Sequence, residues 1–241
     1  MHDSARYPGL RPEAPWITET PPPGPARRRI LGLDLGKSVD FTALTVLDWT
    51  EAHATTPHPS YQVSNLRRFA LGTSYTEIAA WLVKFFQTDD PARRGEPPPC
   101  LVVDETGVGA AVVEMIPTAL GKANVPGGMV AVTITAGSAV TLTAGQAGRW
   151  RVAKKQLASV LVRLFQSRRL NIVKLAETAV LLKEAQAFSI KITPAGNETY
   201  ESWRENDHDD LVLALALSCW AAETLQFEPW PPLPRVAGFR P

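Results

Sequence analysis

The chain has 241 residues, of which 45% are hydrophobic, enough for the core of one large domain or two small ones. Its formal net charge of +1 excludes a surface that is basic all over, so any nucleic-acid contact must come from local clusters of Lys and Arg. Cys100 and Cys219 lie far apart in apolar runs, which gives no sign of a disulfide framework or a zinc site.

Both ends of the chain differ in composition from its middle. Seven prolines fall within the first 28 residues, and the tail from Pro229 is similarly rich in proline, which blocks regular backbone hydrogen bonding. We therefore expect a Pro-rich extension over 1–28, one folded domain over 29–227 and a Pro-rich tail over 228–241. The start of the chain lacks an apolar signal core, and no apolar run is long enough to span a bilayer. These features predict a soluble, cytoplasmic protein without membrane contact.

Three strand-like stretches open the expected domain, at about 29–36, 41–48 and 61–69. Each is rich in β-branched and apolar residues, and turn-forming residues separate them, so a three-stranded meander is expected. Apolar residues then recur at helical spacing, which predicts a helix over 75–88 with its N-cap at Thr73 or Ser74.

Helices and strands alternate in the rest of the domain. The expected elements, in chain order, are a strand at 100–104, a helix at 108–120, a strand at 129–135, a helix around 157–165, a helix near 174–186, a hairpin near 187–203 and a closing helix from about 209. This order predicts an α/β fold with a mixed, five-stranded central sheet and helices on both faces. It resembles the ribonuclease H-like fold, with an extra β-hairpin before the last helix, and places the first and fourth strands side by side.

Two aspartates stand at or near the ends of buried strands. Asp34 follows the apolar run that begins at Ile30, and Asp104 ends the run that begins at Cys100. An unpaired carboxylate is costly in such a place, so positive charge is expected nearby, and a hard divalent cation is the simplest source. Because the first and fourth strands are expected to be neighbours, Asp34 and Asp104 should lie side by side.

A third acidic cluster, residues 206–210, opens the closing helix. If this helix begins at Asp209, its first residues can face the same cavity as Asp34 and Asp104. We expect Asp209 to complete the set of catalytic, metal-binding carboxylates, with Asp210 as a further ligand and His208 as an auxiliary residue.

Structural roles remain open for each aspartate. Asp34 could pair with Lys37 or cap a turn, and Asp104 could end its strand in a turn formed with the Thr and Gly that follow. Asp209 and Asp210 could stabilise the N-terminus of the helix by capping its N–H groups.

Positive charge is concentrated between residues 149 and 174, a segment without any acidic residue. Such a cluster can neutralise backbone phosphates and bind nucleic acid without sequence preference. An ordinary solvated helix face is the alternative. The residues expected to bind DNA are Arg149, Arg151, Lys154, Lys155, Arg168 and Arg169.

Several of these motifs together resemble the nuclease domain of phage large terminase subunits, over nearly all of residues 30–223. The matching stretches are Gly32-Leu33-Asp34, Asp40 to Leu44, Val103 to Gly109, Val152 to Lys155, Ser167 to Ile172 and His208 to Leu217. No GxxxxGK[ST] loop occurs in the sequence, so we do not expect the packaging ATPase of a large terminase in this chain.

The resemblance implies a metal-dependent endonuclease that cuts double-stranded DNA with two divalent cations, Mg²⁺ or Mn²⁺. Two such ions about 3.5–4 Å apart can activate a water and neutralise the leaving oxygen. Asp34 would bridge the ions, with Asp104 and Asp209 beside it. The implied partners are DNA and a separate packaging ATPase, small terminase or portal protein, in the cytoplasm of the host cell if a phage encodes the chain.

Two other functions remain as alternatives. A phosphotransferase of the actin-like ATPase and sugar-kinase superfamily also opens with an Asp on a strand and a Gly-rich turn, which residues 34–37 resemble. However, Gly127-Gly128 is a poor candidate for its adenosine site, and 241 residues leave no room for its duplicated domain. The second alternative is a catalytically inactive DNA-binding module of the same fold.

Overall fold

The structure is a computed structural model that describes residues 17–18, 27–36, 40–52, 57–88, 96–108, 110–143, 148–192 and 209–225. Within these residues the chain forms one nine-stranded sheet with strand order β1-β9-β4-β3-β2-β5-β6-β8-β7. The strands are β1 (Ile17–Thr18), β2 (Arg27–Asp34), β3 (Ala43–Thr50), β4 (Ser60–Arg68), β5 (Cys100–Asp104), β6 (Gly128–Thr135), β7 (Val140–Leu142), β8 (Arg149–Ala153) and β9 (Leu170–Val173). The helices are α1 (Tyr75–Thr88), α2 (Ala110–Lys122), α3 (Lys154–Gln166), α4 (Thr178–Ile192) and α5 (Asp210–Thr224).

The centre of the sheet has the predicted arrangement. Strands β2, β3 and β4 form an antiparallel meander, and β5 pairs with β2 in parallel, followed by β6. The first and fourth expected strands are therefore neighbours, and the ribonuclease H-like prediction is confirmed. The N-cap of α1 is also confirmed, because Ser74 and Glu77 form a reciprocal capping box.

The edges of the sheet differ from the prediction. The described chain has nine strands rather than five, because β1 and β9 extend the sheet beyond β4 while β8 and β7 extend it beyond β6. These strands have two to five residues, too few to show an alternating pattern in the sequence. Residues 187–192 belong to helix α4 rather than to the expected hairpin, and the rest of that hairpin lies outside the described residues.

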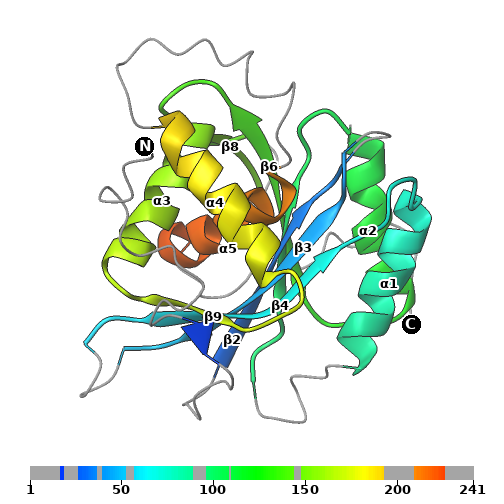
Figure 1. The fold of residues 1–241 in the computed structure, drawn as a ribbon. Coiled ribbons are helices and arrows are strands. Elements are labelled where there is room, and N and C mark those ends of the chain that lie inside the picture. Colours follow the sequence, from blue (N-terminus) through cyan, green and yellow to red (C-terminus); the bar gives the residue numbers. More distant parts are fainter. Residues whose placement is uncertain are drawn as a thin grey trace.

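Helices cover both faces of the sheet, with α3, α4 and α5 on one side and α1 and α2 on the other (Figure 1). Neighbouring residues of each strand face opposite cores: Ile30 packs with α3–α5, whereas Leu31 packs with α1 and α2. Helix α5 is apolar all round, and every residue from Asp210 to Ala221 is buried. It is the helix that lies against β2 and β3 at the centre of the molecule.

None of the described helices has both the length and the apolar character needed to cross a bilayer.

Candidate active site

The strand pairing places Asp34 beside Asp104. Strands β2 and β5 are parallel, and Leu33 is opposite Val103, so the two aspartates are the next residues in register. Both lie on the face covered by α5, because Ile30 and Val102, an even number of residues earlier on their strands, pack into that core. Asp104 is buried, and its Oδ1 accepts a hydrogen bond from the Thr106 backbone N–H at 2.7 Å. Asp104 thus also stabilises the turn that follows its strand, which is the alternative role given for it above.

Helix α5 reaches the same place because β2 carries a glycine there. A methyl group at Gly32 would lie 1.8 Å from the carbonyl oxygen of Ala214, so only glycine allows the helix to lie so close to the strand. Gly32 is two residues before Asp34, and Ala214 is about one turn after Asp210. The close contact therefore brings the first turn of α5 to the end of β2.

Three carboxylates act on Asp34 as a result, those of Asp104, Asp209 and Asp210. Burial raises the pKa of Asp34 well above its ordinary value, and the negative charges of Asp104, Asp210 and Asp209 raise it further, in that order of strength. Burial also raises the pKa of Asp104 to about 6, against the hydrogen bond from Thr106. Raised pKa values of this kind are typical of a site that is short of positive charge.

Lys154, the first residue of α3, supplies part of that charge. Its Nζ lies 3.0 Å from Asp209 Oδ2 and 5.7 Å from the centre of the Phe188 ring. Burial lowers the pKa of Lys154, whereas Asp209, Asp34 and Asp104 oppose that effect. Lys154 is one of the residues expected to bind DNA, and although its side chain is directed to Asp209, its contact with DNA stays a prediction.

The N-terminus of α5 is capped by a residue that the sequence analysis missed. Asp209 occupies the N-cap position without a capping side-chain hydrogen bond. Instead, Glu184 Oε2, from α4, accepts the N–H groups of Leu211 at 2.9 Å and Val212 at 3.0 Å. Burial raises the pKa of Glu184 to about 7.

Arg68 is the second residue that the sequence analysis missed. It ends β4, donates a hydrogen bond to Glu184 Oε1 and lies 3.3 Å from Asp210 Oδ2. Its guanidinium stacks on the Phe41 ring, 4.6 Å from the ring centre. A signal for Glu184 does exist in the sequence, because it is the one charged residue at helical spacing among apolar Leu181, Ala185 and Phe188.

The residues expected to bind DNA lie at two separate places. Arg149, Arg151 and Lys155 lie near the start of α3, where Arg149 pairs with Glu105 at 2.9 Å while Arg151 and Lys155 are exposed. Arg168 and Arg169 follow the other end of this 13-residue helix, about 20 Å away.

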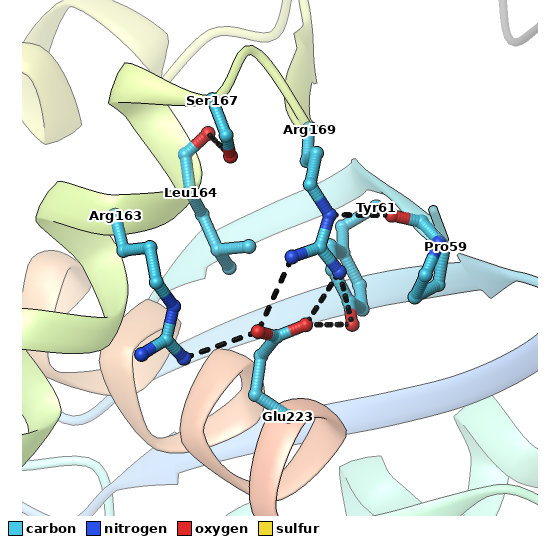
Figure 2. Close-up of polar contacts among 7 residues, drawn as sticks. All are labelled: Pro59, Tyr61, Arg163, Leu164, Ser167, Arg169 and Glu223. Carbon is cyan, nitrogen blue, oxygen red and sulfur yellow. Dashed lines mark hydrogen bonds and ion pairs between the residues drawn. The ribbon is translucent and has the colours of Figure 1, made fainter. Parts of the chain in front are cut away.

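Arg169 belongs to a polar cluster at the far end of α5. Figure 2 shows Arg169, Arg163 and Tyr61 directed toward Glu223. Arg169 lies 2.6 Å from Glu223 Oε1 and also donates to the backbone oxygen of Pro59 at 2.8 Å. This side chain is held inside the protein, and its contact with DNA stays a prediction, as does that of exposed Arg168.

The donor set suits a hard divalent cation, because carboxylate oxygens are the ligands that Mg²⁺ and Mn²⁺ prefer. Within the described part of the chain, no three acidic, His or Cys side chains already converge as a ligand group. Lys154 and Arg68 hold the α5 aspartates instead. His208 and Lys37 lie outside the residues that the structure describes.

No family model matches the sequence, and no curated protein matches it. Among solved structures, the human cytomegalovirus terminase nuclease domain, soaked in manganese with an inhibitor bound, has a TM-score of 0.53 at 12% identity, covering 82% of this chain and 84% of that one. The chain has the ribonuclease H-like fold of terminase nuclease domains.

Two further solved structures match with TM-scores below 0.5. The large terminase nuclease of the thermophilic phage G20c has a TM-score of 0.48 at 19% identity, with 80% of this chain and 81% of that chain covered. The Thermus thermophilus RuvC structure has a TM-score of 0.41 at 14% identity, and the match covers 85% of this chain and 99% of that chain.

Proposed function

We propose that this chain is a metal-dependent endonuclease that hydrolyses the phosphodiester bonds of DNA. The observation that carries the proposal is the gathering of Asp104, Asp209 and Asp210 around Asp34, where the carboxylates raise its pKa. Two divalent cations, Mg²⁺ or Mn²⁺, would supply an activated water and neutralise the charge on the phosphate oxygens. The neighbours in fold include a terminase nuclease domain soaked in manganese, which supports this choice of metals.

Each acidic residue has its own part in the proposal. Asp34, at the end of the central strand, would bridge the two ions, and Asp104 and Asp209 would bind on either side of it. Asp210 would be a further ligand. Glu184 caps α5 and Asp209 makes no capping side-chain hydrogen bond, which supports a role for Asp209 in metal binding.

We further propose that double-stranded DNA is the substrate. Exposed Arg151 and Lys155 lie at the same end of α3 as Lys154, so phosphates bound to them would be close to the carboxylates. By analogy with terminases, a separate packaging ATPase, small terminase or portal protein would act together with this chain.

The direct test is plasmid cleavage by the purified chain in Mg²⁺ or Mn²⁺. Replacing Asp34 with Asn removes one charge with little change in shape and should lower cleavage by at least about 100-fold. Asp48→Asn is the control, because Asp48 is a buried carboxylate of β3 that pairs with Arg29 rather than facing the site. Full cleavage by the Asp34 variant would refute the proposal.

An inactive DNA-binding module is the second candidate. It is favoured by one observation, that no three described acidic, His or Cys side chains are already arranged to hold an ion. This candidate predicts DNA binding without cleavage and without uptake of Mn²⁺. Calorimetric titration with MnCl₂ separates the two, because the nuclease should bind manganese through Asp34.

A further inference from the structure

The first turn of α5 depends on a carboxylate from another helix. The first N–H groups of a helix have no partner within the helix and need acceptors from elsewhere. One oxygen of Glu184 accepts two of them, those of Leu211 and Val212. Asp209 and Asp210 belong to the same turn, so the position of Glu184 sets the position of both aspartates.

The other oxygen of Glu184 binds Arg68, which also reaches Asp210. A single guanidinium nitrogen of Arg68 contacts Glu184 Oε1 and lies 3.3 Å from Asp210 Oδ2. The side chain of Arg68 is only 16% exposed, that of Glu184 4% and that of Asp210 7%. Strand β4, helix α4 and helix α5 are thus joined by one buried network of charges.

Arg68 is also aligned with Asp34 across the sheet. Asp34 is opposite Ala43 on β3, and Ala43 is opposite Arg68 on β4. The three residues form a row across three strands, which are about 4.8 Å apart from one to the next. Arg68 therefore ties Asp210 to the row of the sheet that contains Asp34.

The energetics of such a network favour a role in geometry. Buried ion pairs cost much of their attraction in desolvation, and apolar residues of the same size would stabilise a core at least as well. The contribution of a charged network in this place is to hold the groups that it contacts in fixed positions. Those groups are Asp210 and the backbone of the turn that contains Asp209.

We propose that Arg68 and Glu184 are positioning residues that hold the aspartates of α5 against Asp34 in the geometry required to bind metal. This inference rests on the function proposed above. Neither residue is proposed to touch the metal or the DNA. Partners in the second layer around a metal commonly change its affinity about 10- to 100-fold when they are removed.

The chain contains a matched control pair. Arg29 and Asp48 form an ion pair at 2.7 Å, with side-chain exposures of 15% and 3%, nearly those of Arg68 and Glu184. Arg29 is five residues before Asp34 on β2, about 16 Å along the strand. A loss of stability alone should therefore be similar in the two pairs.

The experiment compares Glu184→Gln with Asp48→Asn by calorimetric titration with MnCl₂ and by thermal unfolding in EDTA. We expect both variants to lower Tm, and only Glu184→Gln to weaken the binding of Mn²⁺, by about tenfold or more. If both variants bind Mn²⁺ as tightly as the unchanged chain, or both weaken it equally, Glu184 has a structural role only and the inference is wrong.

A second pair covers the case in which Glu184→Gln does not fold. Arg68→Lys keeps the charge but loses the planar guanidinium that contacts both carboxylates and stacks on Phe41, and Arg29→Lys is its control. Weaker Mn²⁺ binding in Arg68→Lys alone supports the inference, and equal binding in the two overturns it. The unchanged chain and Asp34→Asn test the proposed function separately: if the unchanged chain takes up no Mn²⁺, the nuclease proposal fails first.

Discussion

Two of the four aspartates of the site are paired with positively charged side chains. Asp209 is held by Lys154 at 3.0 Å, and Asp210 is held by Arg68 at 3.3 Å. Burial raises the pKa of Asp34, and the charges of Asp104, Asp210 and Asp209 raise it further. Because Lys154 stands where a metal ion would neutralise the same carboxylates, its ammonium group and a divalent cation should compete.

That competition makes Lys154 a residue whose replacement should help metal binding. In Lys154→Met the carboxylates lose a nearby positive charge, so the chain in EDTA should be less stable, by about 1–2 kcal/mol. Mn²⁺ no longer has to displace the ammonium group, so it should raise Tm more in this variant than in the unchanged chain. The measurement is thermal unfolding with and without MnCl₂.

Lys155 provides the control because it is the next residue of the same turn and is exposed. Lys155→Met should leave both the stability in EDTA and the gain with Mn²⁺ unchanged, while it weakens DNA binding. An equal gain in Tm with Mn²⁺ in the two Met variants would show that Lys154 does not compete with the metal.

Among the elements of the fold, α5 positions two of the four aspartates of the site, Asp209 and Asp210. Its N-terminal end is held by Glu184 and Arg68, and its C-terminal end by the cluster around Glu223 in Figure 2. Between these ends the helix lies on β2 at Gly32, with no space for a side chain. The position of α5 on the sheet is therefore set by contacts at both of its ends and in its middle.

Gly32→Ala tests this contact. The added methyl group would meet the backbone of α5, which cannot rotate away as a side chain can, so the free energy of unfolding should fall by about 1–3 kcal/mol. Because the helix must rise from the strand, Mn²⁺ binding should weaken as well. Urea denaturation and calorimetric titration measure the two effects.

Gly121→Ala is the matched control. Gly121 lies in α2, and apart from its chain neighbours and the backbone of its own helix, a methyl group there would have no atom within 4 Å. Alanine is the better helix former, so this variant should be unchanged or more stable by about 0.5–1 kcal/mol. A Gly32→Ala variant as stable as Gly121→Ala would contradict the close packing of α5 on β2.

The elements that carry the site were predictable from the sequence, and those at the edges were not. Strands β2 and β5 are apolar runs with a charged residue at the end, and their order along the chain made them neighbours. Strands β7 and β9 have three and four residues, and β9 pairs with β4, which lies far away in the chain. Arg68 and Glu184 meet only after folding, so no local pattern joins them.

For the molecule as a whole, the carboxylates predict how stability depends on pH. Asp34, Asp104 and Glu184 have raised pKa values, chiefly through burial, with Asp104 at about 6 and Glu184 at about 7. The folded chain therefore binds more protons than the unfolded chain at these pH values, and its stability falls as pH rises through them. Burial would raise the pKa of Glu223, but hydrogen bonds from Arg169 and Tyr61 outweigh it and lower that pKa. The contribution of Glu223 to stability is therefore lost as the pH falls below the ordinary pKa of 4.5.

Chemical denaturation in EDTA should show this dependence. We expect the free energy of unfolding to drop by about 1–3 kcal/mol between about pH 5 and pH 8, and by less in Asp104→Asn. Mn²⁺ should reverse the trend, because its affinity rises as the carboxylates lose their protons. Rising stability over this range without metal would contradict the raised pKa values.

The proposed function requires that Asp34, Asp104 and the aspartates of α5 bind divalent metal together. Anomalous diffraction from crystals soaked in MnCl₂ locates any such metal. We expect manganese in contact with Asp34 and Asp104 and with at least one of Asp209 and Asp210, with the Nζ of Lys154 moved away from Asp209. Well-ordered aspartates without manganese between them, at a concentration that supports DNA cleavage, would contradict it.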